Sequence, residues 1–527
     1  MLTFVSFLAF TAFVAFYAWY KLRKDNLSSQ DGYFLGGRSL TGVVIAGSML
    51  LTNISTEHLI GLNGSAYKNG FPVIAWEVTS AIALIVAALY FVPRYLKMGL
   101  TTIPQYLEYR YDGLTRTIVA LFLILSFIFT LLPIVLFTGA INLESIFNIS
   151  EVLGVSRAEG LWITVVLIGV IGSIYAIFGG LKAVAYSDTI NGYGLLLGGL
   201  LVPILALVQI GDGNPLDGLL KVYHFAPAKF NVIGAPDSVM PFEVLFTGLI
   251  INQLYFWCMH QTIIQRALGA KNLIEAQKGL LLTGVLKILI PIIIMLPGVI
   301  GFYYFGDSLY DMQDSVYPEL VKRVLPVGLL GFFAAVVMGA VLSTFNSVLN
   351  SAATIFSVGI YKRHLKKNAT EQTLVRVGKI TSSILAGFAI MVAPFVANAP
   401  EGLYQLLQVL NGIFFIPVAS IILAGFFLPR VSAAGAKSAI FVGLAFYVTT
   451  TFILKVNIHF IHIWGIEFIL NLIVMFVVSY FYPVKRTFNI ADVQVVDMHH
   501  WKYAKPMGLS LIAITILIYI LLGQAGR

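Results

Sequence analysis

Two residues of opposite charge stand alone in apolar stretches of this sequence. Lys287 lies in the run 279–297, and Glu77 lies in the run 71–92. A charge at mid-depth in a membrane span is costly, so such a residue normally faces a polar interior and has a partner there. One buried cation and one buried anion therefore predict a solute pathway through a membrane. The alternative is a structural ion pair that joins two helices.

The composition places most of the chain in a lipid bilayer. Apolar residues make up 59% of the 527 residues, charged residues make up 11%, and the mean hydropathy is +0.90. Soluble domains carry about 25% charged residues. The single cysteine, Cys258, excludes a disulfide framework and a cysteine metal cluster. The sequence has no Walker A pattern, so transport driven directly by ATP is not expected. It also shows no group of residues that would form a catalytic nucleophile or a metal site, so an enzyme is not expected.

Apolar runs of about 20 residues predict an all-α polytopic membrane protein with fourteen transmembrane helices. The first run has no preceding positive charge and no cleavage site, which predicts a retained span and not a signal peptide. The segment 211–240 between two spans is expected to be an outer loop with a short helix. The predicted spans are 2–20, 41–63, 72–96, 117–147, 160–178, 187–210, 241–265, 279–304, 327–359, 375–397, 402–428, 434–454, 459–482 and 507–523.

The basic residues predict the direction of these spans. With the N-terminus outside, the loops on the inner side hold 24 of the 33 lysines and arginines. Arg266 is among them, immediately after the predicted span 241–265. An excess of Lys and Arg marks cytoplasmic loops. We therefore expect a multi-pass protein of the cell membrane with both termini on the extracytoplasmic side.

Polar residues interrupt the second predicted span at its centre. The segment 53–58, Asn-Ile-Ser-Thr-Glu-His, has five polar side chains among its six residues. Ser, Thr and Asn bond to nearby backbone and loosen a helix. We expect an unwound stretch with free carbonyl groups, which discontinuous helices offer to a coupling cation. The alternative is a polar cluster that packs two helices together.

A second polar cluster, 343–351, lies in the ninth predicted span. Ser343 and Thr344 present adjacent hydroxyls, and Ser347 follows one turn later. Hard cations such as sodium prefer oxygen ligands. Two hydroxyls and a carbonyl from this helix, facing carbonyls of the interrupted helix, would make a five-oxygen site. A packing stripe of small and hydroxyl residues is the alternative.

A third group consists of amides, charges and aromatic rings inside the predicted spans. Such groups suit a polyhydroxylated solute, whereas a carboxylate solute calls for an arginine. No arginine falls at mid-depth in a predicted span, since Arg94 and Arg376 lie at span ends, and this favours a neutral polar solute. The polar members are His58, Glu77, Ser80, Gln253, Lys287 and Gln408, and the aromatic members are Trp76, Phe256 and Tyr404.

These residues resemble the solute:sodium symporters, and within them the bacterial sodium/sugar cotransporter branch, over essentially the whole chain. The resemblance implies a LeuT-like fold with an inverted repeat of five plus five helices, 41–210 and 241–428. One extra helix (1–22) precedes the repeats, and three helices (434–527) follow them. The segments that carry the resemblance are 33–39, 53–57, Ile60-Gly61, Trp76-Glu77, 175–181, Ser187-Asp188, 261–266, 275–279, Ser343-Thr344 and 349–352.

The resemblance also implies a sodium site. Some relatives hold a second sodium with an extra hydroxyl one turn before the hydroxyl pair, but Ala340 stands there, so one sodium per solute is expected. Asp188 is expected to guide the leaving ion or, alternatively, to cap a helix. The implied sodium ligands are the carbonyls of Leu51, Ile54 and Ala340 and the hydroxyls of Ser343 and Thr344.

The third group corresponds to the family's solute site, with two departures. The family's sugar binders usually have Gln where His58 stands and Asn where Gln253 stands. Leu62, Trp76 and Tyr404 are the expected outer lid, and Phe256 takes the place of the inner-gate tyrosine. The expected function is sodium-driven uptake of a neutral polar solute, a monosaccharide first, by a monomer with alternating access. A polyol, an amino acid or another small organic solute is the alternative, and a channel or a membrane-embedded enzyme is the more distant one.

Overall fold

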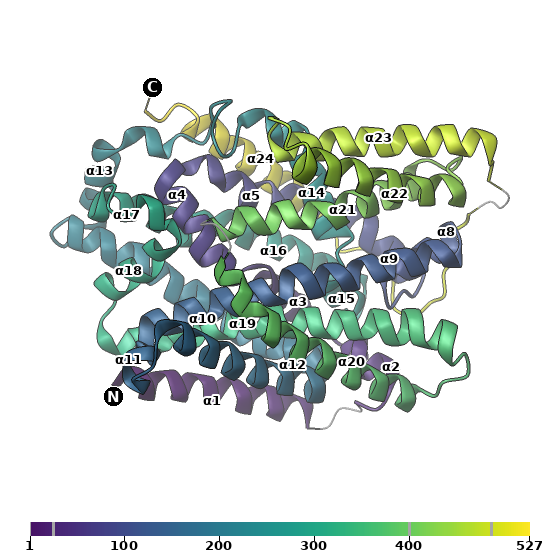
Figure 1. Ribbon diagram of the computed structural model, residues 1–527, viewed down its shortest axis with the longest axis horizontal. Coiled ribbons are helices and arrows are strands. Elements are labelled where there is room, and N and C mark those ends of the chain that lie inside the picture. The colour runs from purple at the N-terminus through teal and green to yellow at the C-terminus, as the bar shows by residue number, and fades with distance from the viewer. Residues whose placement is uncertain (1, 24–26, 399–401, 485–487, 527) are drawn as a thin grey trace.

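The computed structural model describes residues 2–23, 27–398, 402–484 and 488–526, and it folds these residues into an elongated helical bundle (Figure 1). The described residues form no β-strand, and one isolated bridge pairs Leu40 with Ala270. Lipid offers no hydrogen bonds, so backbone groups at membrane depth must pair internally, and long apolar runs fold as helices. The orientation predicted above also counts Lys24, Lys485, Arg486 and Arg527, which lie outside the described residues.

Twelve segments of the described residues are helical, long and apolar enough to cross a bilayer, and each overlaps one predicted span. They are α1 (Leu2–Leu22), Phe71–Lys97, Gly113–Phe147, Arg157–Ile177, Gly179–Ile210, Leu273–Phe305, Val327–Leu365, Glu371–Val396, α21 (Leu403–Phe427), Ala433–Ile453, α23 (Phe460–Phe481) and α24 (Ala504–Leu522). The other helices within them are α5 (Ala75–Val78), α6 (Ser80–Val86), α7 (Val92–Lys97), α9 (Gly113–Ser126), α10 (Leu132–Phe147), α12 (Arg157–Ile210), α16 (Leu273–Ile293), α17 (Met295–Phe305), α19 (Val327–Thr354), α20 (Glu371–Val392) and α22 (Ala433–Val448).

The helix α12 turns a corner at Gly180 and so supplies two spans. Gly180 has φ 58° and ψ −167°, and a Cβ there would lie 2.6 Å from the carbonyl oxygen of Tyr33. Only glycine adopts this conformation at such close approach without strain. The hydroxyl of Tyr33, in α2 (Gln30–Phe34), donates to the carbonyls of Ala176 and Ile177, each at 3.0 Å. Two segments that carry the family resemblance, 33–39 and 175–181, therefore meet at this corner.

The second predicted span is broken, as its polar residues predicted. It consists of α3 (Gly42–Asn53), the π-helical turn η2 (His58–Leu62) and α4 (Asn63–Asn69). The two halves are bent by 66°. Ile54 at the break has extended backbone, with φ −89° and ψ 96°. The carbonyls at the end of α3 therefore lose the amide donors that a continuing helix would supply.

The seventh predicted span, 241–265, is also discontinuous, which the sequence pattern did not indicate. The 3₁₀ turn η7 (Phe242–Phe246) precedes α14 (Gly248–Cys258), and α15 (Gln261–Leu268) follows after a break. His260 has φ −70° and ψ 123°, and the carbonyl of Tyr255 accepts from the amides of both Met259 and His260 at 2.9 Å. The break contains neither glycine nor proline, so the surrounding helices impose it.

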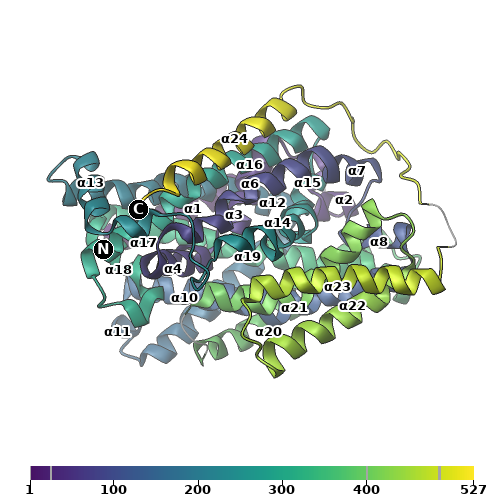
Figure 2. The same cartoon turned by 90° about the horizontal axis from the view of Figure 1, so that it is seen from above.

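Both described ends of the chain lie at the same end of the bundle in two views (Figures 1 and 2). This placement requires an even number of crossings. Among the described residues, twelve segments and the bent pair of α3 and α4 are long and apolar enough to span, and the broken segment of α14 and α15 is the candidate that would bring the number to fourteen. At the end that carries the termini lie α13 (Pro215–Phe225), which is the short helix expected in 211–240, and α18 (Val316–Val324). At the opposite end lie α2 and α8 (Ile103–Arg110), and the remaining short helix is α11 (Ile149–Leu153).

Candidate solute and sodium sites

A buried cavity between the two broken helices collects most of the predicted solute residues. It measures about 80 Å³, well below the range of about 300–1,000 Å³ that is typical of ligand pockets. Space of this size holds a few water molecules, so a larger solute requires the helices or the lid to move. The predicted residues that line it are His58, Glu77, Ser80, Gln253, Lys287, Gln408, Trp76, Phe256, Tyr404 and Thr344.

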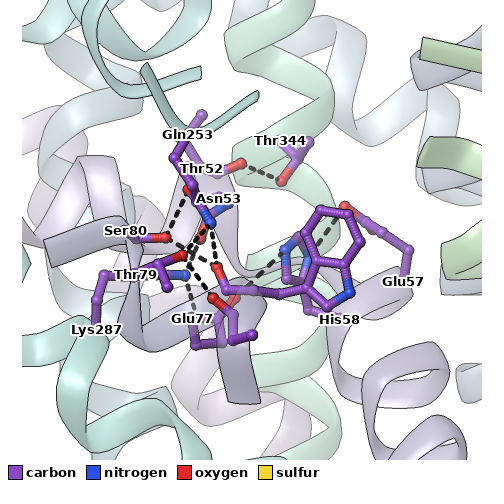
Figure 3. A network of polar contacts seen from close by, with 12 residues as sticks. Thr52, Asn53, Glu57, His58, Glu77, Thr79, Ser80, Gln253, Lys287 and Thr344 are labelled. Atoms are coloured by element: carbon purple, nitrogen blue, oxygen red, sulfur yellow. Dashed lines mark hydrogen bonds and ion pairs between the residues drawn. The ribbon is translucent and has the colours of Figure 1, made fainter. Parts of the chain in front are cut away.

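Lys287 and Glu77 form an ion pair in this cavity (Figure 3). The ammonium group of Lys287, on α16, also donates to the side-chain oxygen of Asn53 at 2.5 Å. Its Nζ lies 5.4 Å from the centre of the Trp257 ring. Both charged side chains are about 1% exposed. The structure thus pairs the two isolated charges, the contact that the structural alternative expected, and the pair also engages the last residue of α3.

Gln253 is held by hydrogen bonds within the protein. Its Oε1 accepts from the Ser80 hydroxyl at 3.0 Å and from the Trp257 indole at 3.2 Å. Its Nε2 donates to the carbonyl of Trp76 at 2.8 Å and to the hydroxyl of Thr79 at 3.0 Å (Figure 3). All four hydrogen-bonding positions of this amide are thus occupied. In this conformation Gln253 and Ser80 join α14 to α5 and α6, and a solute would have to replace some of these bonds.

His58 lies between two carboxylates at the broken helix. Its Nδ1 is 3.5 Å from Oε1 of Glu57, and its Nε2 is 3.9 Å from Oε1 of Glu77. Its ring meets the ring of Tyr404 edge-on, with centroids 5.1 Å apart. Glu57 itself lines the cavity and is 2% exposed. The position of His58 suits exchange of hydrogen bonds with a polar solute.

Two of the three predicted lid residues lie together over the cavity. The rings of Trp76 and Tyr404 have centroids 5.6 Å apart and meet edge-on. A Cβ at Gly61 would lie 2.6 Å from Cβ of Tyr404, so glycine permits this close approach of η2 to α21. Leu62 is buried and does not line the cavity, and its expected place in the lid stays a prediction. Phe256 lines the cavity as expected and stacks on His260 at 5.3 Å.

The proposed sodium ligands lie where α19 meets the break. The Thr344 hydroxyl donates to the carbonyl of Thr52 at 3.0 Å, and the hydroxyls of Thr52 and Ser347 are 3.1 Å apart. The hydroxyl of Ser343 is buried and has no hydrogen-bond partner among the described residues. A hydroxyl oxygen that donates its proton keeps lone pairs for a cation. The hydroxyls and the carbonyl-rich break therefore fit a hard monovalent cation, while Leu51, Ile54 and Ala340 are all fully buried beside them.

Asp188 and Arg266 form a buried ionic junction that the sequence pattern did not predict. Arg266 was assigned to a cytoplasmic loop, but it is 0% exposed in α15 and lies within the bundle. Its Nη2 is 3.6 Å from Oδ2 of Asp188, and its Nε donates to the hydroxyl of Ser48 at 3.1 Å. It also donates to the hydroxyl of Ser347. The carboxylate of Asp188 accepts from Ser48 at 2.6 Å, so α3, α12, α15 and α19 meet here.

Sequence reasoning left several further cavity residues without a role. All are polar side chains inside predicted spans or at the break, which was the only signal available for them. They are Thr52, Asn53, Glu57, Asn252, His260 and Asn411. Glu467 on α23 does not line this cavity, but it is a further polar residue for which the sequence predicted no role. It is 0% exposed, and neither carboxyl oxygen has a hydrogen-bond partner among the described residues.

Comparison with known proteins gives one consistent result. The profile of the sodium:solute symporter family matches residues 33–443. The uncharacterized symporter YidK of Escherichia coli (strain K12) is 45% identical over 96% of this chain and 88% of its own length. The sodium/glucose cotransporter of Vibrio parahaemolyticus is 32% identical over 80% of each chain. The sodium/myo-inositol cotransporter of Homo sapiens is 31% identical over 78% of this chain, which spans 61% of that protein.

Solved structures agree on the fold. A Na⁺-coupled sialic acid symporter in a substrate-bound, outward-open state superposes with a TM-score of 0.76 over 92% of this chain and 99% of its own, at 21% identity. The nucleobase-cation symporter Mhp1 in a closed conformation superposes with a TM-score of 0.57 at 15% identity. The fold is thus the LeuT-like fold of Na⁺-coupled transporters. Together with the matched profile, it establishes that this multi-pass membrane protein belongs to the sodium:solute symporter family, a family of transporters that use sodium.

Proposed function

We propose that this protein couples the inward flow of one sodium ion to the uptake of one neutral polyhydroxylated solute, in the first place a monosaccharide. The cavity offers amide, imidazole, carboxylate and ammonium groups beside aromatic rings, which is the composition that a ring-shaped polyol requires. Relatives that carry a solute name are described as glucose and myo-inositol cotransporters. Sodium supplies the driving force, since one charge moving through 100 mV is worth about 2.3 kcal/mol.

The contact between the two predicted sites carries this proposal. Asn53 ends α3 at the break, next to the proposed sodium ligand Ile54, and it accepts from Lys287 in the solute cavity. Thr344, a proposed sodium ligand, also lines that cavity. A cation that draws α19 and the break together would therefore also fix the position of Asn53 and of the lysine. Ordering of the solute cavity by sodium follows directly from these shared residues.

The transport cycle then uses the two breaks as hinges. Sodium from outside binds between α3 and α19, and the ordered cavity accepts the solute through its hydroxyl groups. Trp76 and Tyr404 close over it. Separation of the inner halves of the broken helices, including the junction of Asp188 with Arg266, opens the path to the cytoplasm. Asp188 contacts Ser48 and Arg266 at this junction, and its expected role in guiding the leaving sodium ion is part of the proposal.

Several features support the proposed architecture and orientation. The predicted repeats 41–210 and 241–428 each begin with a helix that is broken near its middle, as an inverted repeat requires. The excess of basic residues assigns the end of the bundle that carries α2 and α8 to the cytoplasm and both termini to the outside. We also propose that a monomer is sufficient for transport.

The charges around the cavity favour a neutral solute. Glu57 and Glu77 are carboxylates, Lys287 is already paired with one of them, and Arg266 does not line the cavity. An anionic solute would add a third negative charge in a low-dielectric setting. A cyclic polyol is the second candidate, because it presents the same ring of hydroxyls as a sugar and because the myo-inositol cotransporters are relatives. An amino acid would have to separate the pair formed by Lys287 and Glu77.

The test is uptake by the purified protein in proteoliposomes. Labelled glucose, galactose, myo-inositol, proline and sialic acid are supplied under an inward sodium gradient and under an equal potassium gradient. We expect accumulation of a neutral hydroxylated solute that requires sodium, with a Hill coefficient for sodium near one. Flux that persists without sodium would indicate a channel, and accumulation of proline or sialic acid in preference to the polyols would contradict the solute assignment.

A further inference from the structure

A second cavity lies on the lipid-facing side of the bundle, between α6, α14, α21 and α24. It measures about 640 Å³, within the range of about 300–1,000 Å³ that ligand sites occupy. Its rim is open, because Ile250 and Ile516 are 50% and 53% exposed. These four helices belong to or line membrane spans, so the molecules that reach this groove are those dissolved in the bilayer.

Four polar groups interrupt the otherwise apolar lining of this groove, and they come from two helices, α14 and α24, and from the turn between α5 and α6. They are Thr79, Gln253, Thr515 and Tyr519. Thr515 is 4% exposed, and its hydroxyl has no hydrogen-bond partner in the described part of the chain; the same holds for the hydroxyl of Tyr519. Two unpaired hydroxyls are costly where lipid tails offer no hydrogen bonds. An occupant with an oxygen atom would satisfy them.

Gln253 connects this groove with the solute cavity, because it lines both. On one side it contacts Ser80 and Trp257, and on the other it donates to the hydroxyl of Thr79. Thr79 in turn donates to the carbonyl of Ala75 at 2.6 Å, next to the lid residue Trp76. Since Thr79, Gln253, Thr515 and Tyr519 line the same groove, an occupant held at Thr515 and Tyr519 would pack against Thr79 and Gln253 and disturb the hydrogen bonds that hold the wall of the solute cavity.

We propose that this groove binds an amphiphile from the bilayer, with an apolar chain or ring body and a terminal hydroxyl, and that its binding changes the affinity for solute through Gln253. The apolar lining accepts the body, and Thr515 and Tyr519 bind the hydroxyl. The groove has the size of a ligand site and the usual lining of one, which is an apolar pocket with a few polar groups. The effect on solute affinity rests on the proposed transport function, whereas binding itself does not.

Photolabelling of the full-length protein in phosphatidylcholine proteoliposomes tests the binding. The probe is a long-chain fatty alcohol that carries a diazirine, and labelled peptides are identified by mass spectrometry. We expect labels on α14 and α24 that oleyl alcohol competes away. The variant Ile516→Trp fills the groove and should abolish them, whereas Ile514→Trp, at a 43% exposed position of the same helix outside the groove, should retain them. Thr515→Val removes one hydrogen bond to the alcohol, so the concentration of oleyl alcohol that halves the labelling should rise about fivefold.

Uptake assays on the same vesicles test the coupling. Oleyl alcohol should shift the solute KM of the unmodified protein and of Ile514→Trp, and it should leave the KM of Ile516→Trp unchanged. Labels spread evenly over all lipid-facing helices, or labels that Ile516→Trp retains, would overturn the site. Specific labelling with no shift in KM would overturn the coupling through Gln253. The labelling experiment does not depend on transport, so it tests binding even if the transport proposal fails.

Discussion

Lys287 donates a hydrogen bond to Asn53, the last residue of α3, and thereby links the solute cavity to the break in the first discontinuous helix. The two residues are far apart in the sequence and come from helices in different predicted repeats. Because of this contact, a change in the conformation of the break would move the ammonium group of Lys287 in the cavity. In the proposed function, this contact is the physical link between the sodium site and the solute site.

The first prediction concerns the buried ion pair. Lys287→Gln leaves the carboxylate of Glu77 without its partner, so we expect loss of uptake and a decrease of about 3–5 kcal/mol in the free energy of unfolding. The double variant with Glu77→Gln removes both charges and should regain most of the stability without regaining uptake. Thermal unfolding in detergent and uptake in proteoliposomes measure the two effects. Normal uptake by the single variant would show that the pair is only structural.

The second prediction concerns the sodium site. Ser343→Ala removes one proposed oxygen ligand, so the sodium concentration for half-maximal uptake should rise about tenfold, the equivalent of about 1.4 kcal/mol. Ser382→Ala is the matched control, since Ser382 on α20 is also fully buried and its hydroxyl is also unpaired among the described residues. Sodium titrations of initial uptake rates compare the two. An equal effect of both substitutions would refute the assignment of Ser343.

The third prediction concerns the junction between Asp188 and Arg266. Arg266→Gln removes the cation that joins four helices, so the inward-open state should become more populated. A thiol introduced by Thr262→Cys in a Cys258→Ala background should then react several-fold faster with a reagent supplied from the cytoplasmic side. Thr262 is suitable because it lines the solute cavity. Arg94→Gln is the control, because the side chain of Arg94 donates to the carbonyl of Tyr90. Unchanged reactivity in Arg266→Gln would mean that this junction does not hold the inner side closed.

The fourth prediction concerns orientation. In the Cys258→Ala background, Leu216→Cys places a thiol on α13, at a position that is 68% exposed near the termini. Asn368→Cys places one at an exposed position after the basic end of the ninth span. A membrane-impermeant maleimide should label the first in intact cells and the second only after lysis. The reverse pattern would invert the proposed topology.

Much of the fold and part of the site could be predicted because the bilayer applies simple rules to a sequence. An apolar run of sufficient length must be a helix. A polar residue within such a run is costly, so it must have a polar partner or line a polar cavity. The sequence therefore singled out segment 53–58 and the isolated charges Lys287 and Glu77. The structure has the predicted break, and it pairs the two charges with each other, as the structural alternative expected. The solute roles of these residues remain predictions.

The sequence by itself determined the membrane class, the helical fold, the approximate spans and the polar groups at mid-depth. Only the tertiary structure decided the break between α14 and α15, the burial of Arg266, the position of Leu62 outside the cavity and the saturation of Gln253 by hydrogen bonds. Each of these depends on partners from helices that are distant along the chain. Local composition does not identify those partners. A hydrogen bond or an ion pair between two helices depends on how the helices approach each other, and the residue pattern within one helix does not show this.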